Sequence, residues 1–273
     1  MTEKETSLPK ITKIETQKRK ERYNIYVDGE YAFPVDEAIL IKYVLHKDME
    51  MPADLMKKIM ADDTERKYYN QALGYISYRL RSEKEVRQHL KEKEATADII
   101  EKTVQKLKEQ KYLDDQIYGD SFVRTAATIS QKGPGVLKQE LKLKGLKDEV
   151  ITQALTQYSN DQLIENALKL AQKTWKKHRN TSQREAKNKV QQILFQKGYT
   201  QEVIQQVLAA LDTEKTPEDE YESVQTQGAK IWRKNQRHDL RKRIQKTKQS
   251  LYQKGFPADM ITQFIEEIQL EEE

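Results

Sequence analysis

The sequence predicts a mainly α-helical protein built from tandem three-helix repeats in an elongated curved array, with a small N-terminal β-hairpin or three-stranded element. Two observations predict this fold class. Four fifteen-residue segments align with one another without a gap. They begin at Leu90, Leu141, Leu194 and Leu251. The first sixty residues contain instead an alternation of apolar and polar residues that breaks at Asp28-Gly29, which is typical of a two-residue β-hairpin.

Composition limits the class of protein before any motif is considered. Of 273 residues 34% are charged, so a deep single core is not expected. Lys and Arg number 49 and Asp and Glu 44, a net charge of +5 that is compatible with a nucleic-acid or acidic protein partner without requiring either. The absence of cysteine excludes disulfides and thiolate metal sites. No apolar signal sequence or membrane-length apolar run is present, so we expect a cytoplasmic protein with no membrane partner.

The N-terminal region differs from the rest of the chain. Residues 21–35 predict the hairpin, and residues 11–20 could add a third strand. Residues 35–45 and the segment that starts at Pro52 read as two helices. We therefore expect residues 1–62 to form a β-rich cap with short helices.

The repeated segment predicts a helix end followed at once by a helix start. Three glycines occupy the same place in the alignment, where each is expected to end a helix in the left-handed conformation. They are Gly145, Gly198 and Gly255. In a Schellman cap the next residue packs on the leucine five positions earlier, and the pairs are Leu141 with Leu146, Leu194 with Tyr199, and Leu251 with Phe256. The first segment has Glu94 instead, and because glutamate disfavours positive φ we expect that cap to close differently.

Each joint belongs to a module of three helices. An apolar stripe of helical period follows every joint, and another helix precedes the joint. The expected modules are residues 63–113, 114–159, 160–216 and 217–273. One such module buries too little apolar surface to be stable alone, so neighbouring modules are expected to share buried surface, as in other repeat proteins.

Residues that could carry chemistry have simpler structural explanations. Asp114-Asp115 could be a catalytic or metal-binding carboxylate pair, but a helix N-cap with a first-turn acid explains it better. Residues 133–135, Gly-Pro-Gly, lack the rest of a phosphate-binding loop and open a helix. The four histidines lie far apart with no ligand spacing, and Trp175 and Trp232 are expected to pack in the core or between modules. We predict no catalytic, cofactor or metal site, and therefore no enzyme.

Two ordered sets of residues resemble a known family. One set is Tyr112-Leu113-Asp114-Asp115, Tyr118, Phe122-Val123-Arg124, Gly133-Pro134, Leu137, Glu140-Leu141 and Lys144-Gly145. The other is Ala72-Leu73, Tyr75, Tyr78-Arg79, Arg81-Ser82, Glu85 and Leu90. Together they resemble the RecX family, regulators of the RecA recombinase. Through the repeat the resemblance extends over most of residues 64–273, with departures at Glu94, where glycine is usual, and Leu80, where proline is common.

The resemblance implies a protein that lodges in or along the groove of the RecA–DNA filament and modulates it, usually by inhibition, in the regulation of DNA repair and recombination. Basic residues at 173–184 and 233–249 have few compensating acids, while acids gather at 213–222 and 271–273. Such basic runs are commonly solvated helix faces, and contact with filament DNA phosphates or with an acidic protein surface stays open. The predicted partner-contact residues are Arg79, Arg81, Arg124, Lys138, Lys142, Arg233, Arg237, Arg241 and Arg243.

Two other functions stay open at this point. The chain could be a stand-alone nucleic-acid-binding protein, or a helical-repeat adaptor for other proteins. In each case we expect a monomer without a cofactor.

Overall fold

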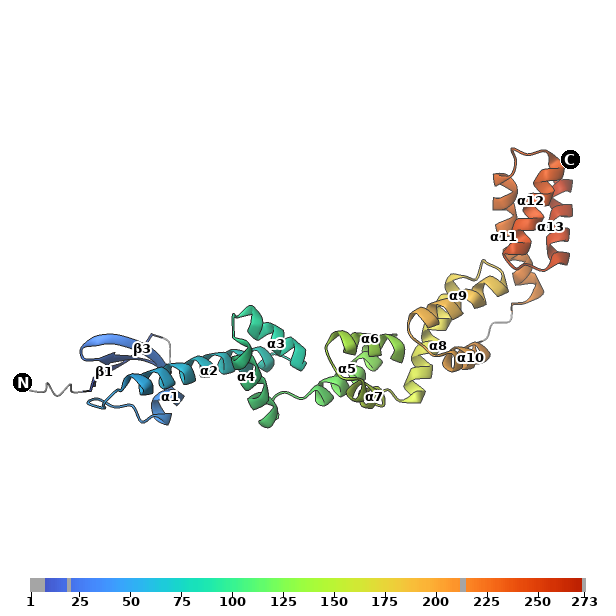
Figure 1. Cartoon of the computed structure of the whole chain (residues 1–273). Coiled ribbons are helices and arrows are strands. Elements are labelled where there is room, and N and C mark those ends of the chain that lie inside the picture. The colour runs from blue at the N-terminus through green and yellow to red at the C-terminus, as the bar shows by residue number, and fades with distance from the viewer. Residues whose placement is uncertain (1–7, 19–20, 212–214, 272–273) are drawn as a thin grey trace, which may run out of the picture. The chain divides into compact units, whose positions relative to one another are not determined.

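The computed structural model describes residues 8–18, 21–211 and 215–271 (Figure 1). This part of the chain contains thirteen helices and three strands, and none of these helices is both long and apolar enough to cross a membrane. The chain forms two compact units, Met1–Tyr118 and Gly119–Glu273. Residues 213–214 and 272–273, which belong to the two expected acidic clusters, lie outside the described residues.

An antiparallel sheet with strand order β1-β2-β3 opens the first unit. The strands are β1 (Ile11–Thr16), β2 (Arg22–Val27) and β3 (Glu30–Asp36). Asp28 and Gly29 have φ angles of 50° and 90°, the left-handed pair that a tight two-residue hairpin needs. The predicted hairpin and its third strand are therefore confirmed.

Helix α2 (Ala53–Ser77) joins the sheet to the first module. Its N-terminal half buries Ile59 in the sheet core, and its C-terminal half buries Tyr69 and Ala72 in the module core. We expected two helices here, with a domain boundary after residue 62. One helix of 25 residues runs through that position, because no glycine or proline interrupts residues 53–73.

A buried carboxylate fixes α2 against the sheet. Asp63 accepts a hydrogen bond from the Arg22 guanidinium at 2.9 Å and another from the Asp36 backbone N–H at 2.7 Å. Asp36 also caps the short helix α1 (Glu37–Lys42) by accepting from the Ala38 N–H. The sheet, α1 and α2 therefore share one polar joint beside their apolar core.

Each module contains three helices. The remaining helices are α3 (Glu83–Glu92) and α4 (Ala97–Glu109), α5 (Asp115–Ile129), α6 (Pro134–Leu143) and α7 (Asp148–Leu155), α8 (Asn160–Lys177), α9 (Gln183–Gln196) and α10 (Gln201–Ala210), and α11 (Pro217–Lys234), α12 (Leu240–Gln253) and α13 (Ala258–Leu270). Trp232 is buried in the core of the fourth module, and Trp175 packs half-buried against the core of the third. Both tryptophans therefore pack as predicted.

The glycine caps form as the sequence predicts. Gly145, Gly198 and Gly255 have φ angles of 89°, 85° and 88°. In each cap the N–H of the next residue donates to the carbonyl of the leucine five positions earlier, at 3.1 to 3.3 Å. Our expectation for Glu94 is wrong. Its φ is 64°, and Ala95 N–H donates to the Leu90 carbonyl at 3.1 Å, so the first cap closes in the same way despite its glutamate.

Residues 133–135 begin α6, as predicted, and they also join the second module to the third. Gly133 N–H donates to the Lys197 carbonyl at 2.7 Å, and Gly135 N–H donates to the Gly198 carbonyl at 2.9 Å. A Cβ atom on Gly133 would lie 2.6 Å from the Gly198 carbonyl carbon. The second helix of one module therefore starts directly on the capped turn of the next, at a distance that only glycine permits.

The joint between the third and fourth modules uses side chains where the preceding joint uses backbone groups. Ser182, the N-cap of α9, donates from Oγ to the Lys254 carbonyl at 2.5 Å. The buried Glu220 of α11 accepts from the Gln183 N–H at 3.0 and 3.1 Å and pairs with Lys215 at 3.3 Å. A carboxylate from the following module thus caps the N-terminus of α9.

The first unit contains a similar contact. Asp114 caps α5, accepting from the Gln116 N–H at 2.7 Å, so the predicted cap is confirmed. Asp115 instead accepts from the Glu83 N–H, at the start of α3, at 2.8 Å. Burial raises the pKa of Asp115, although the hydrogen bond from Glu83 opposes the rise. The two adjacent acids therefore cap two different helices.

Candidate partner-binding surface

The nine basic residues predicted to contact a partner do not form one cluster. Arg79 and Arg81 lie between α2 and α3 in the first unit. The others lie in the second unit, on α5, on α6 and on or between α11 and α12. Their surroundings divide them into residues that pack within a module and residues that are exposed.

Arg81 and Arg243 pack against aromatic rings. The Arg81 guanidinium lies 4.0 Å from the centroid of the Tyr75 ring, and that ring stacks on His89 at 4.0 Å. Burial lowers the pKa of His89, which favours the neutral ring in this stack. The Arg243 guanidinium lies 3.9 Å from the Trp232 ring, and its Nε donates to the Trp232 carbonyl at 3.2 Å. Both arginines are half-buried, so they stabilise their own modules through cation–π contacts.

Three of the remaining candidates have polar neighbours on the surface. Arg79 lies 3.7 Å from Glu85, Arg124 donates to Gln157 at 3.1 Å, and Lys142 pairs with Asp148 at 2.8 Å. The Lys142 hydrogen bond lowers the pKa of Asp148. Exposed ion pairs of this kind contribute about 0–1 kcal/mol, so a partner could replace them at small cost.

Four candidates are exposed and form no ion pair with another residue of the described ranges. They are Lys138, Arg233, Arg237 and Arg241. Three of them surround the turn between α11 and α12, so the basic stretch of the fourth module is largely solvent-facing. Exposed cations without an ion pair are available to a negatively charged partner.

Each of the four modules has the same two exposed positions on its second helix, and the reasoning from sequence missed them. The residue six positions before each capped turn is an exposed glutamine on the second helix of its module. These are Gln88, Gln139, Gln192 and Gln249. The residue three positions before the turn is also exposed, and in the third and fourth modules it is Phe195 and Tyr252, which are 70% and 69% exposed. We call these eight positions the glutamine face. Its other two members are Lys91 and Lys142.

An alignment of the repeats on their caps could have found the glutamine face. A buried residue repeats because the core needs it, whereas an exposed one has no packing reason to repeat. Large exposed aromatic side chains are also costly to leave in water and are frequent in protein interfaces. The glutamine face is therefore the surface that sequence and structure together favour for a partner.

The described residues contain no group of three or more His, Asp or Glu placed to hold a metal ion. The fold defines a class of mainly helical proteins in which three-helix modules follow an N-terminal three-stranded sheet along the chain.

Models of known families match most of the chain. The N-terminal domain of regulatory protein RecX matches residues 9–52, and the first and second three-helix domains of RecX match residues 69–107 and 114–155. The third three-helix domain matches twice, at residues 160–208 and 218–265. The chain belongs to the RecX family.

Relatives in other bacteria agree with this membership. The chain is 38% identical over 259 residues to "Regulatory protein RecX" of Limosilactobacillus reuteri, covering 95% of this chain and 98% of the relative. It is 40% identical over 261 residues to the protein of the same name from Bacillus cereus, covering 94% and 97%.

Two solved structures are also similar. "Crystal structure of regulatory protein RecX" has a TM-score of 0.68 at 40% identity and covers 74% of this chain and 100% of that one. A RecX structure from Lactobacillus salivarius has a TM-score of 0.54 at 35% identity and covers 56% and 99%. The predicted family is confirmed, as is a mainly helical fold of three-helix repeats with an N-terminal three-stranded sheet, and the chain is a RecX-family regulatory protein.

Proposed function

We propose that the chain binds the RecA–DNA nucleoprotein filament and inhibits its recombinase activity. The observation that carries the proposal, beside family membership, is the glutamine face. A filament is a polymer of identical subunits, so modules with the same exposed residues can meet equivalent sites on successive subunits. Modest contacts then add through a high effective concentration, since one bound module holds the next near its site.

The exposed basic residues support this proposal in a second way. Lys138 and Arg124 lie on the second module, and Arg233, Arg237 and Arg241 lie on the fourth. Positive side chains without strong acidic partners can contact the DNA phosphates of the filament or acidic patches on RecA. The proposed partner contacts are therefore polar and aromatic on the glutamine face, and electrostatic at these cations.

The test measures RecA's DNA-dependent ATPase and strand exchange with substoichiometric amounts of the purified chain. We expect wild type to slow both. A variant with Gln139→Ala, Gln192→Ala and Gln249→Ala should need about tenfold more protein for the same effect, a loss of about 1.4 kcal/mol. Alanine favours helix, so the fold is kept.

A matched control uses three other exposed glutamines, one on the third helix of each of the same modules. These are Gln153, Gln206 and Gln263. Their replacement by alanine should leave the potency unchanged. Equal loss in both triple variants would refute the role of the glutamine face, and a wild-type chain without effect on either RecA activity at any concentration would refute the proposed function.

A stand-alone nucleic-acid-binding protein is the second candidate function. The exposed cations of the fourth module favour it. Neutralising six phosphates would make the logarithm of affinity for duplex DNA fall with the logarithm of salt concentration at a slope of about −5. Tight binding to naked DNA with this slope, and no effect on RecA, would support this candidate.

A further inference from the structure

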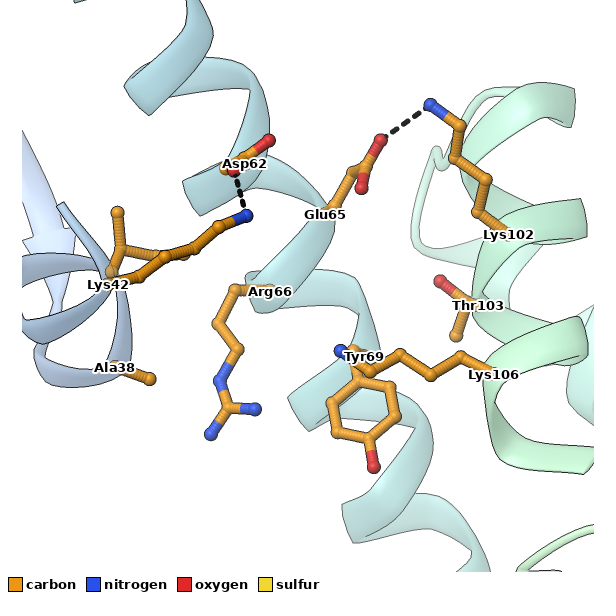
Figure 2. Close-up of a pocket in the computed structure, with 10 residues that line it drawn as sticks. Ala38, Lys42, Asp62, Glu65, Arg66, Tyr69, Lys102, Thr103 and Lys106 are labelled. Atoms are coloured by element: carbon orange, nitrogen blue, oxygen red, sulfur yellow. Dashed lines mark hydrogen bonds and ion pairs between the residues drawn. The ribbon is translucent and has the colours of Figure 1, made fainter. Parts of the chain in front are cut away.

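A basic pocket of about 280 Å³ lies within the first unit, between α1, α2 and α4 (Figure 2). Four cations and two carboxylates line it, and they are Lys42, Arg66, Lys102, Lys106, Asp62 and Glu65. Two carboxylates outside the lining, Asp36 and Asp98, pair with Arg66 and Lys102. None of these residues belongs to the candidate surface described above.

Helix geometry brings these charges together. Asp62, Glu65, Arg66 and Tyr69 follow one face of α2 at the spacing i, i+3, i+4 and i+7. Lys102 and Lys106 lie one turn apart on α4, and Lys42 ends α1. Since α2 packs against both other helices, its charged face becomes the floor of a pocket with lysines on either side.

The two outer lysines form ion pairs that a stronger anion could replace. Lys42 contacts Asp62 at 2.5 Å, and Lys102 contacts Glu65 at 2.7 Å (Figure 2). Lys102 also pairs with Asp98, one turn earlier on α4, at 2.9 Å. The lysine side chains are 59% and 55% exposed. Exposed pairs are weak, so either ammonium group can turn toward a stronger anion at small cost.

Of the two inner cations, Lys106 forms no ion pair with any residue that the structure describes, and Arg66 forms a long one with Asp36. Lys106 reaches across from α4 to Tyr69, with its Nζ 4.6 Å from the ring centroid, and it forms no ion pair within the described part of the chain (Figure 2). Arg66 lies 5.6 Å from the same ring. Its buried Nε is 3.4 Å from Asp36 Oδ1 but donates no hydrogen bond to a described residue. Two like charges beside one ring repel each other, and a bound anion would offset that repulsion.

We propose that this pocket binds a phosphate group of a nucleic-acid backbone. A guanidinium offers a fork of donors, and an ammonium offers a further point charge. The several oxygens of a phosphate can accept from both at once, whereas the two oxygens of a carboxylate are satisfied by Arg66 alone. Lys42 and Lys102 lie on opposite sides of the pocket, where they can meet the neighbouring phosphates of the same strand (Figure 2). This inference goes beyond the proposed function, because the site needs no recombinase.

The experiment measures binding of a labelled single-stranded oligonucleotide by fluorescence anisotropy between about 50 and 200 mM salt. The pocket variant carries Arg66→Gln and Lys106→Gln. The control variant carries Lys47→Gln and Lys93→Gln, which remove the same charge from exposed positions, one in the loop before α2 and one at the end of α3. We expect about tenfold weaker binding for the pocket variant and a salt slope shallower by about 0.7, the loss of one phosphate contact. The control should change affinity by less than about threefold, as long-range screening implies.

Two further variants keep the proposal falsifiable. Lys106→Gln alone removes a cation that has no ion pair to break, so it should weaken binding with an unchanged circular dichroism spectrum. Arg66→Lys with Lys106→Arg conserves the charge and should retain most of the affinity. Equal losses in the pocket and control variants, or an unchanged salt slope, would overturn the proposal, because they would indicate only a diffuse effect of net charge.

A second experiment distinguishes a nucleic-acid phosphate from a free phosphate as the ligand of the pocket. Pyrophosphate at constant ionic strength should raise the Tm of wild type but not of Lys106→Gln, and it should compete with the oligonucleotide. If pyrophosphate stabilises wild type while the pocket variant binds the oligonucleotide normally, the assignment to a nucleic-acid backbone is wrong. A pocket variant that loses oligonucleotide binding but still inhibits RecA separates this site from the proposed function.

Discussion

Replacing Gly133 with alanine tests the joint between the second and third modules. Gly133 has φ of −83°, a conformation that alanine adopts freely, so any effect must come from space. The added Cβ would lie 2.6 Å from both the carbonyl carbon and the oxygen of Gly198, and 2.7 Å from the Tyr199 nitrogen. All three are backbone atoms, which cannot rotate away as a side chain can. The substitution therefore has to push the two backbone segments apart.

The cost follows from the hydrogen bonds at this joint. Ordinary contact begins near 3.4 Å, so the segments must separate by about 0.8 Å. The donations from Gly133 to Lys197 at 2.7 Å and from Gly135 to Gly198 at 2.9 Å would then exceed hydrogen-bond distance. At about 1 kcal/mol each, their loss predicts about 2 kcal/mol of destabilisation.

The assay is urea unfolding followed by circular dichroism, with amide hydrogen exchange at Gly133 and Gly135 as a local measure. Gly74→Ala is the matched control. Gly74 lies inside α2, where an added Cβ meets nothing within 4 Å. Because alanine favours the helix, this control should gain about 0.5–1 kcal/mol. The argument is refuted if Gly133→Ala is as stable as wild type or gains stability as Gly74→Ala does, with unchanged exchange at the joint.

Three further predictions concern the caps and the packed cations. Glu94→Gly should raise the free energy of unfolding by about 1 kcal/mol, since glycine adopts positive φ without strain, and a loss of stability would contradict the cap geometry. Asp115→Asn should become more stable relative to wild type as pH rises above about 4. Burial raises the pKa of Asp115 in the folded chain, so ionisation of this carboxyl above that pH opposes folding of wild type only. A stability difference that does not change with pH would contradict this prediction. Arg243→Gln should lower Tm and shift Trp232 emission, whereas the exposed Arg241→Gln should change stability by less than about 0.5 kcal/mol, and equal effects would argue against the cation–π contact.

Features determined by neighbours in sequence were predictable. The glycine caps, the Asp114 cap and the Asp28-Gly29 turn each depend on the φ preference or side-chain acceptor of one or two residues. The apolar stripes depend only on helical period. These local rules defined the capped helix ends and the class of fold but not the continuity of α2, and the ordered motif residues indicated the family.

The tertiary structure decided which of the charged residues are available to a partner. The sequence does not show that Arg81 and Arg243 stack on aromatic rings while Arg79 and Arg241 are exposed. Whether a cation stacks depends on how the packed helices position an aromatic ring beside it. Glu94 keeps a left-handed backbone against its own preference, so the packing of α3 and α4 outweighs local strain.

The repeat, its capped joints and the family could be read from the amino-acid order alone, since they follow from residues within one or two helical turns. Only the folded chain placed the backbone of residues 133–135 against Gly198, and only it gathered Lys42, Arg66 and Lys106 around one pocket. Contacts between residues far apart in the chain depend on how whole helices pack, and local dihedral preference and periodicity carry no information about that packing.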